Sequence, residues 1–392
     1  MLIDSRILIF IGFFLRLIVA LWNGFFEFNF GQIGDPGSFH GWASYFSQNP
    51  TISNCEENIR HVMSCGLGFV YFLTTDSLFI GSLMSILAWW VSALVLLKIM
   101  SILLVEKSNQ KKMMLIYALL PSSIIMTSIT LREPYQLLLV NLGVFAALKI
   151  YWNKSLMHWL TMFFSVYFMP FLHGGLLVFG LFILISTLIL LARRRYASGF
   201  NKIKLVFLAP IFFLIVIMGG EAFINSSINY GDLREGLAVG IESYQKGGIQ
   251  ANFNSSASYR DTIKIKNNFD LILFIPTSLF QYLFEPMPWR AGRPQDIALL
   301  LENLLRAYLI WKGWTGLRRA SGKMKNAMLF IFISYFAIEV IWAQGTMNWG
   351  TASRHHIPGL GLLVLFAFAY SKPARLRPKP LTPVNATMIS EN

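Results

Sequence analysis

Charged side chains are scarce in this sequence. Of its 392 residues, 13% are Asp, Glu, Lys or Arg and 55% are hydrophobic, and the mean hydropathy is +0.55. A soluble globular domain carries a charged fraction of about 25%. The composition therefore excludes an ordinary soluble domain. The long apolar runs along the whole chain predict a polytopic helical membrane protein.

Common catalytic signatures are also absent. The chain has no P-loop, no GxGxxG, no HExxH and no GxSxG sequence. Nucleotide-driven transport and zinc proteolysis therefore have no support. The net charge of +14 could suggest a nucleic-acid partner, but lysine and arginine cluster in short segments between apolar runs, which is a pattern of membrane topology. We expect no nucleic-acid partner.

Cysteine is nearly absent as well. The only two, Cys55 and Cys65, lie ten residues apart, in what we interpret as the first external loop. A compartment outside the cytoplasm permits disulfides. We expect the two cysteines to pair and close the loop; two unpaired thiols are the alternative.

The apolar runs predict an all-α membrane protein of about ten transmembrane helices. Basic clusters follow every second run, so the positive-inside rule places both termini in the cytoplasm. Residues 269–284 are also apolar, but if they crossed, the basic segment 316–325 would lie outside. We therefore predict a re-entrant or interfacial helix there, broken at Pro276. The predicted spans are 7–26, 78–105, 113–130, 134–151, 155–172, 175–192, 204–220, 296–312, 327–344 and 356–371.

The chain then divides into a membrane domain, residues 1–371, and a cytoplasmic tail, residues 372–392. The tail is rich in proline and lysine, a composition that predicts disorder. The major external loops are predicted at residues 27–66 and 221–295.

Most polar side chains outside the basic clusters fall on the external side of this topology. Ionisable groups near membrane depth are costly and are usually functional. Because helix ends at one level of a bundle lie within reach of one another, we expect a common site. The candidates are Asp35, His40, Arg132, Glu133, His173, Glu285, Trp289, Arg290, Arg354, His355 and His356.

Asp35 lies in the sequence Gly-Asp-Pro-Gly, which by itself predicts a turn. The following segment places His40, Ala43 and Tyr45 at helical spacing, as on an amphipathic helix along the membrane surface. Asp35 is therefore either a helix cap or a catalytic carboxylate.

Arg132, Glu133 and Pro134 open a predicted helix. Glu133 and Pro134 fit ordinary helix-start chemistry, but Arg132 does not. An arginine beside the free N–H groups of a helix start is suited to bind an anion. We therefore assign Arg132 to the site.

Four further candidates have structural alternatives. His173 precedes two glycines and could simply mark a helix break. Glu285 and Arg290 could pair with each other, and Trp289 could be an interfacial anchor.

Arg354, His355 and His356 stand directly before the last predicted helix. The N-terminal end of a helix attracts anions, and three adjacent cationic or donor side chains add to that attraction. Two histidines can also bind a metal, but no cysteine or third histidine stands at ligand spacing, so we predict no metal site. A requirement for a divalent ion is left open.

A saccharide carried on a polyprenyl phosphate or pyrophosphate fits this arrangement. Its tail lies in the bilayer, its phosphates at the interface and its sugar outside. Glycosyl transfer needs a carboxylate that accepts the proton of the acceptor hydroxyl and cations that stabilise the departing phosphate. An external aspartate with arginines and histidines supplies both without a cofactor.

Two segments resemble the GT-C class of membrane glycosyltransferases: "GDPGSFHGWA", with Asp35, and "LREPYQLLL", with Arg132. The later segments "LFEPMPWRAGRPQDIALLLENLLRAYL" and "GTASRHHIPGLGLL" are similar to membrane proteins of bacterial surface-polysaccharide clusters. Those proteins are taken as O-antigen or exopolysaccharide repeat-unit polymerases. The resemblance implies a GT-C-like bundle in a bacterial inner membrane. It makes Asp35 the acid/base or acceptor-binding carboxylate, and it places Arg132, Arg290, Arg354 and His355 at the pyrophosphate.

The leading hypothesis is a polymerase of lipopolysaccharide or exopolysaccharide repeat units on undecaprenyl pyrophosphate, acting with membrane lipid and with a chain-length regulator or other assembly proteins. A second hypothesis is a GT-C transferase that adds one sugar from a polyprenyl phosphate. A third is a transporter or flippase for lipid-linked glycans, which would need charges along a central pathway. Arg16, Asp76, Glu302, Arg306 and Glu339 look few and scattered in the sequence. The lack of a large external C-terminal domain favours a polymerase or a single-sugar transferase over an oligosaccharyltransferase that must grip a protein acceptor.

Overall fold

The computed structural model describes residues 4–26, 34–57, 61–153, 157–193, 257–259 and 268–370. Within these ranges the chain is helical, apart from one isolated β-bridge between Ser258 and Asn348. The helices are α1 (Ser5–Phe25), α2 (Asp35–Gln48), α3 (Ile52–Glu57), α4 (Val62–Leu73), α5 (Leu78–Ile102), α6 (Lys107–Leu119), α7 (Pro121–Met126), α8 (Glu133–Asn153), α9 (Met157–Leu172), α10 (Gly175–Arg193), α14 (Asn268–Phe284), α15 (Pro294–Arg319), α16 (Gly322–Gly345), α17 (Trp349–His355) and α18 (Leu360–Phe368).

Four of these helices are long and apolar enough to cross a membrane. They are α1, α5, α8 and α16, and they match four of the ten predicted spans. Shorter apolar helices include α4, α9 and α10. The structure therefore confirms a helical chain with membrane-spanning character. The predicted span 204–220, most of the segment 221–267 and the tail 372–392 lie outside the described residues.

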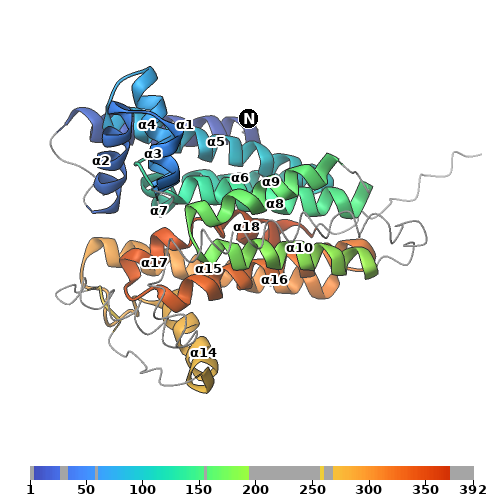
Figure 1. Cartoon of the computed structure of the whole chain (residues 1–392). Coiled ribbons are helices and arrows are strands. Elements are labelled where there is room, and N and C mark those ends of the chain that lie inside the picture. Colours follow the sequence, from blue (N-terminus) through green and yellow to red (C-terminus); the bar gives the residue numbers. More distant parts are fainter. Residues whose placement is uncertain are drawn as a thin grey trace, which may run out of the picture.

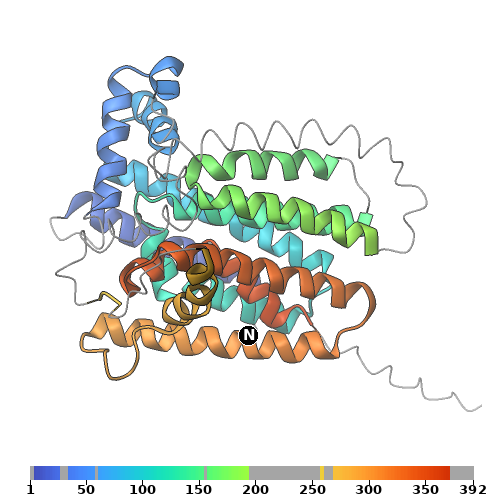
Figure 2. The same cartoon turned by 60° about the horizontal axis from the view of Figure 1, so that its bottom comes forward.

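The long helices run side by side, and the short ones gather at one end. Figure 1 shows α2, α3, α4, α7 and α17 at the left end of the bundle, with α14 projecting below it. The turn between α15 and α16 lies at the opposite end. In Figure 2, α9 and α15 run along the two flanks, and α10 and α16 lie between them. One end of the bundle is therefore built from short helices and turns.

Three predicted elements differ from the structure. The span 113–130 is divided into α6 and α7, because Leu120 takes an extended conformation before Pro121, as the residue before a proline prefers. The helix over 269–284 is not broken at Pro276, which lies inside the continuous α14. The predicted external loop 27–66 contains α2, α3 and the start of α4.

Arg16 illustrates how the bundle buries a charge. Its side chain on α1 is fully buried and donates to the hydroxyls of Thr127 and Ser123 and to the carbonyls of Gly12 and Ala118. Its guanidinium also lies 3.6 Å from the centre of the Trp89 ring. A buried arginine is tolerated only when its donors are satisfied, so Arg16 fastens α1 to α6 and α7.

Candidate functional site

An arginine on α17 joins two acidic residues from distant parts of the chain. Nη1 of Arg354 lies 2.6 Å from Oδ2 of Asp35, and Nε of the same arginine lies 2.9 Å from Oε1 of Glu133. Asp35 begins α2 and Glu133 begins α8. The Asp35 side chain is 51% exposed and that of Glu133 only 2%. The buried pair therefore anchors the guanidinium, and the exposed carboxylate faces outward beside it.

Local sequence explains why both carboxylates stand at helix starts. Gly34 has a φ of 88°, a left-handed conformation that glycine adopts without a steric penalty. Pro36 then occupies the first turn of α2, as proline often does. The Arg132 carbonyl accepts hydrogen bonds from the N–H groups of Tyr135 and Gln136, which starts α8 at Glu133. An acidic side chain in the first turn is favoured by the helix dipole.

Arg132 lies at the same end of the bundle. Its guanidinium is 4.9 Å from the centre of the Phe39 ring on α2. The charges of Arg132 and Arg354 both act on His173, in the turn between α9 and α10. The structure thus brings Asp35, Arg132, Glu133 and Arg354 together, as the sequence predicts. We call these four residues and the adjacent His173 and His355 the α17 site.

The two histidines of the site flank one tryptophan. The rings of His173 and His355 lie 4.3 and 4.4 Å from the ring of Trp342 on α16, measured between centroids. Burial, with Arg132 and Arg354 nearby, lowers the pKa of His173 to about 3. Burial likewise lowers the pKa of His355 well below its usual value, with Arg354 and His173 adding to the effect. Both imidazoles are therefore neutral at physiological pH.

Hydrogen bonds indicate which ring nitrogen carries the proton. Nδ1 of His173 accepts from the N–H of Gly175 at 3.1 Å, so Nε2 of the neutral ring is the donor. Oγ1 of Thr346 donates to the carbonyl of Trp342 and must accept from Nδ1 of His355 at 2.9 Å. His173 thus offers an N–H through Nε2, and His355 carries its lone pair there.

His356 does not join this site, contrary to the prediction. Its Nδ1 lies 2.6 Å from Oε2 of Glu339, and its Nε2 lies 3.2 Å from the carbonyl of Tyr282. Successive residues at a helix end point in different directions, so His355 faces Trp342 while His356 faces the bundle interior. There it lines an internal cavity of about 20 Å³ together with Glu302, Arg306 and Glu339.

The helix-start argument for this segment is also wrong. Arg354 and His355 form the last turn of the separate helix α17, and α18 begins only at Leu360. Cationic side chains at a helix C-terminus are stabilised by the dipole of that helix. Anion attraction by the N-terminus of the last helix therefore plays no part at Arg354.

Glu285 and Arg290 form a second cluster beside the first residue of α17. Nη1 of Arg290 lies 2.8 Å from Oε1 of Glu285, and Nη2 donates to the Ser258 carbonyl at 2.6 Å. The guanidinium lies 4.8 Å from the centre of the Trp349 ring. The pairing considered as an alternative role for Glu285 and Arg290 is thus present. Trp289 next to them is 80% exposed.

His40 fastens α2 to α4. Its Nδ1 lies 2.9 Å from the Tyr71 hydroxyl, and its Nε2 lies 3.8 Å from Oδ1 of Asp76. Ser44 donates to the same Asp76 oxygen. These contacts explain His40 as a residue that fixes the orientation of the helix carrying Asp35.

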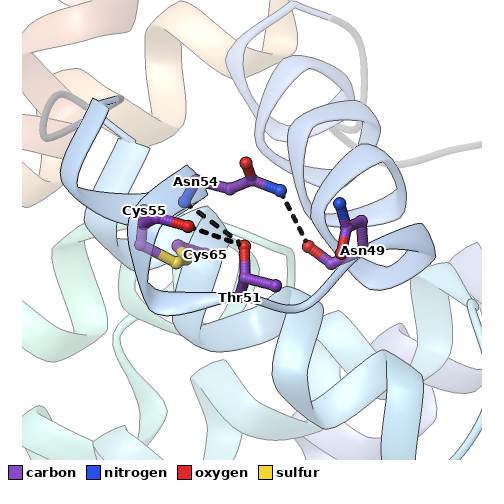
Figure 3. Close-up of a disulfide and its surroundings, with 6 residues drawn as sticks. Asn49, Thr51, Asn54, Cys55 and Cys65 are labelled. Atoms are coloured by element: carbon purple, nitrogen blue, oxygen red, sulfur yellow. Dashed lines mark hydrogen bonds between the residues drawn. A yellow bond between two sulfur atoms is a disulfide. The ribbon is translucent and has the colours of Figure 1, made fainter.

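The expected disulfide between Cys55 and Cys65 is present, with a Cα–Cα distance of 5.9 Å. Figure 3 shows that it joins α3 to the start of α4, next to hydrogen bonds from Asn54 to Thr51 and to Asn49. The cross-link closes a short loop and restrains the hairpin that supports α2.

Some residues of the site could not be identified from the sequence. Trp342 lies inside a predicted span, where a buried tryptophan is ordinary. Thr346 follows that span without any motif. Their part in the site depends on the turn between α16 and α17, which brings them against His355.

Comparison with known proteins gives no relative for this arrangement. No protein-family model, no curated protein and no solved structure matches the chain.

Proposed function

We propose that the chain is a membrane glycosyltransferase acting on saccharides linked to polyprenyl phosphate or pyrophosphate, and that it polymerises surface-polysaccharide repeat units. The observation that carries the proposal is the α17 site. It pairs an exposed carboxylate, Asp35, with Arg354, and it gathers Arg132 and the neutral donor His173 at the same end of an apolar bundle. These groups match the charges that develop during glycosyl transfer from a phosphate.

The chemistry divides between the carboxylate and the cations. Asp35 takes the proton of the acceptor hydroxyl while the oxygen of that hydroxyl attacks the anomeric carbon of the donor. The bond from that carbon to the phosphate oxygen breaks, and the polyprenyl pyrophosphate leaves with the electron pair. Arg132, Arg354 and the Nε2–H of His173 stabilise the leaving group. The proton on Asp35 then passes to solvent.

The two acidic partners of Arg354 have different roles in this scheme. The ion pair with exposed Asp35 is screened and contributes little stability, whereas Glu133 is buried and stays paired. A bound pyrophosphate competes for the outer side of Arg354 and displaces Asp35. The carboxylate is thus released to act as a base when the donor is in place.

The orientation of the chain in the membrane follows from the distribution of its basic residues. Basic clusters at the opposite bundle end lie in the cytoplasm, and the α17 site faces the periplasm of a bacterial inner membrane. Both termini are then cytoplasmic, as the positive-inside rule indicates.

The internal cavity provides the observation that favours a transporter. Glu302, Arg306, Glu339 and His356 are not scattered but surround one space. That space has a volume of about 20 Å³, enough for about one water molecule. It is too small to pass a glycan, so we retain the enzyme as the proposed function.

The first test is made in cells. Deleting the gene and separating the surface polysaccharide on a gel should remove the ladder of chain lengths while leaving one repeat unit. The wild-type gene should restore the ladder. Loss of a single mass increment instead of the ladder would support a single-sugar transferase. Loss of all external glycan, with lipid-linked units retained inside, would support a flippase.

A further inference from the structure

A hollow runs along the exposed flank of α2. The described residues that line it are Ser38, Gly41, Trp42 and Tyr45, and its volume is about 470 Å³. Pockets that bind small molecules commonly enclose about 300–1,000 Å³. The hollow is separate from the internal cavity of the bundle, and the contacts of the α17 site do not account for it.

The hollow begins at Ser38, about one helical turn after Asp35, and leads away from it along α2. Asp35, Ser38, Trp42 and Tyr45 are spaced three or four residues apart, so their side chains share one side of the helix. A rise of about 1.5 Å per residue places Tyr45 roughly 15 Å from Asp35 along the axis. A chain molecule whose end reaches Asp35 can therefore lie along these residues.

The aromatic rings are held in place from behind. Trp42 stacks on His61 with a centroid distance of 4.1 Å and an interplanar angle of 22°. His61 directly precedes α4, which the disulfide at Cys65 joins to α3. Tyr45 meets Trp42 edge-on at 5.9 Å and is 58% exposed. Preformed rings lose little conformational entropy when a ligand binds.

We propose that this hollow binds the sugar chain of the acceptor, an extension that rests on the proposed glycosyl transfer. A pyranose ring has an apolar C–H face that packs on Trp42 and Tyr45, and hydroxyl edges that bond Ser38. Gly41 has no side chain, and a Cβ there would meet nothing within 4 Å. The space next to this residue therefore stays open for a ligand. The terminal hydroxyl of the bound chain then reaches Asp35.

Gly41 offers a direct test, since a Cβ there meets nothing within 4 Å and a large side chain would extend from it into the hollow. The matched control is Gly66 on α4, an exposed helical glycine whose added Cβ also meets nothing within 4 Å. The full chain is purified in lipid nanodiscs. The probe is fluorescently labelled oligosaccharide released by mild acid from the surface polysaccharide of the source cells. Binding is measured by fluorescence polarisation.

We expect the wild type and Gly66→Trp to bind the lipid-free probe, and Gly41→Trp and Trp42→Ala to bind at least tenfold more weakly. Unchanged thermal unfolding of Gly41→Trp would show that the protein is intact. No binding by the wild type, or equal binding by Gly41→Trp and Gly66→Trp, would overturn the proposal. So would a Trp42→Ala variant that binds normally and only associates less with membrane, as a lipid anchor would. Because the probe carries no lipid, a wild type that binds it but transfers no sugar would contradict only the proposed function.

Discussion

Arg354 and Asp35 lie 319 positions apart in the sequence, and their side chains meet at 2.6 Å. The contact joins the start of α2 to the end of α17, and through Glu133 it also reaches α8. This arrangement stabilises the fold mainly through buried Glu133, because the exposed Asp35 half contributes little. It is well suited to hold an arginine where an anion can reach it.

Arg354→Ala should reduce chain polymerisation more than Arg354→Lys does. Both changes remove the planar guanidinium that can grip a phosphate through two N–H groups, but lysine keeps the charge. The alanine variant also leaves Glu133 buried without its partner, which costs about 3–5 kcal/mol, so protein level must be measured with glycan length. The control is Arg319→Ala, an exposed arginine at the end of α15. If both Arg354 variants produced the wild-type ladder of glycan lengths, the residue would have only a structural role.

Lowering the pH should destabilise the protein partly through His173. Its folded pKa is about 3, whereas an unperturbed histidine titrates near 6.5. Between these values the unfolded state binds a proton that the folded state does not, so stability falls as pH falls. The unfolding temperature of His173→Gln should therefore fall less between pH 7.5 and pH 5 than that of the wild type. An equal loss in both proteins would place the charge-sensitive group elsewhere.

The interior pair of Glu339 and His356 should show strong coupling. The two side chains are 1% and 6% exposed and 2.6 Å apart. Removing one leaves the facing atom of the other buried without this hydrogen bond, at a cost of about 1–3 kcal/mol. Glu339→Leu and His356→Leu should each lower the unfolding temperature clearly, and the double variant should lose much less than the sum. Additive losses would argue against a shared hydrogen bond.

Sidedness can be tested with single cysteines, because the two native ones are bonded to each other. Gln48→Cys lies at the exposed end of α2, and Leu104→Cys lies after α5, where the native side chain is 83% exposed. In spheroplasts an impermeant maleimide should label position 48 at once. Position 104 should react only after permeabilisation. The reverse pattern would place the α17 site in the cytoplasm.

Local physics explains the parts that the sequence could predict. The long apolar runs of the sequence predict α1, α5, α8 and α16. The Gly-Asp-Pro-Gly sequence marks the start of α2. The predicted external position of the loop that carries Cys55 and Cys65 indicates the disulfide. In each case the determining residues lie within one continuous segment of the sequence, so no tertiary information is needed.

The parts of the site that could not be predicted depend on contacts between distant segments of the chain. That Arg354 meets Asp35 follows from how α17 folds over the bundle end. The opposite directions of His355 and His356 follow from the end of α17 at residue 355, which the apolar pattern did not reveal. Glu302 and Arg306 stand four residues apart, a spacing that favours an ion pair on one face of a helix. Glu302 instead accepts from the N–H of Ser122, and Arg306 donates to Asn303.

The central claim is that Asp35 accepts the proton in glycosyl transfer from a lipid phosphate. Its most direct test is reconstitution of the purified chain with a lipid-linked repeat unit as the sole substrate, with the products separated by length. The control is Asp76→Asn, since Asp76 is exposed to a similar degree at the same bundle end, 46% against 51%. We predict a ladder of glycans with release of polyprenyl pyrophosphate from the wild type and Asp76→Asn, and none from Asp35→Asn. A ladder of equal length from Asp35→Asn, or no product from the wild type, would contradict the account.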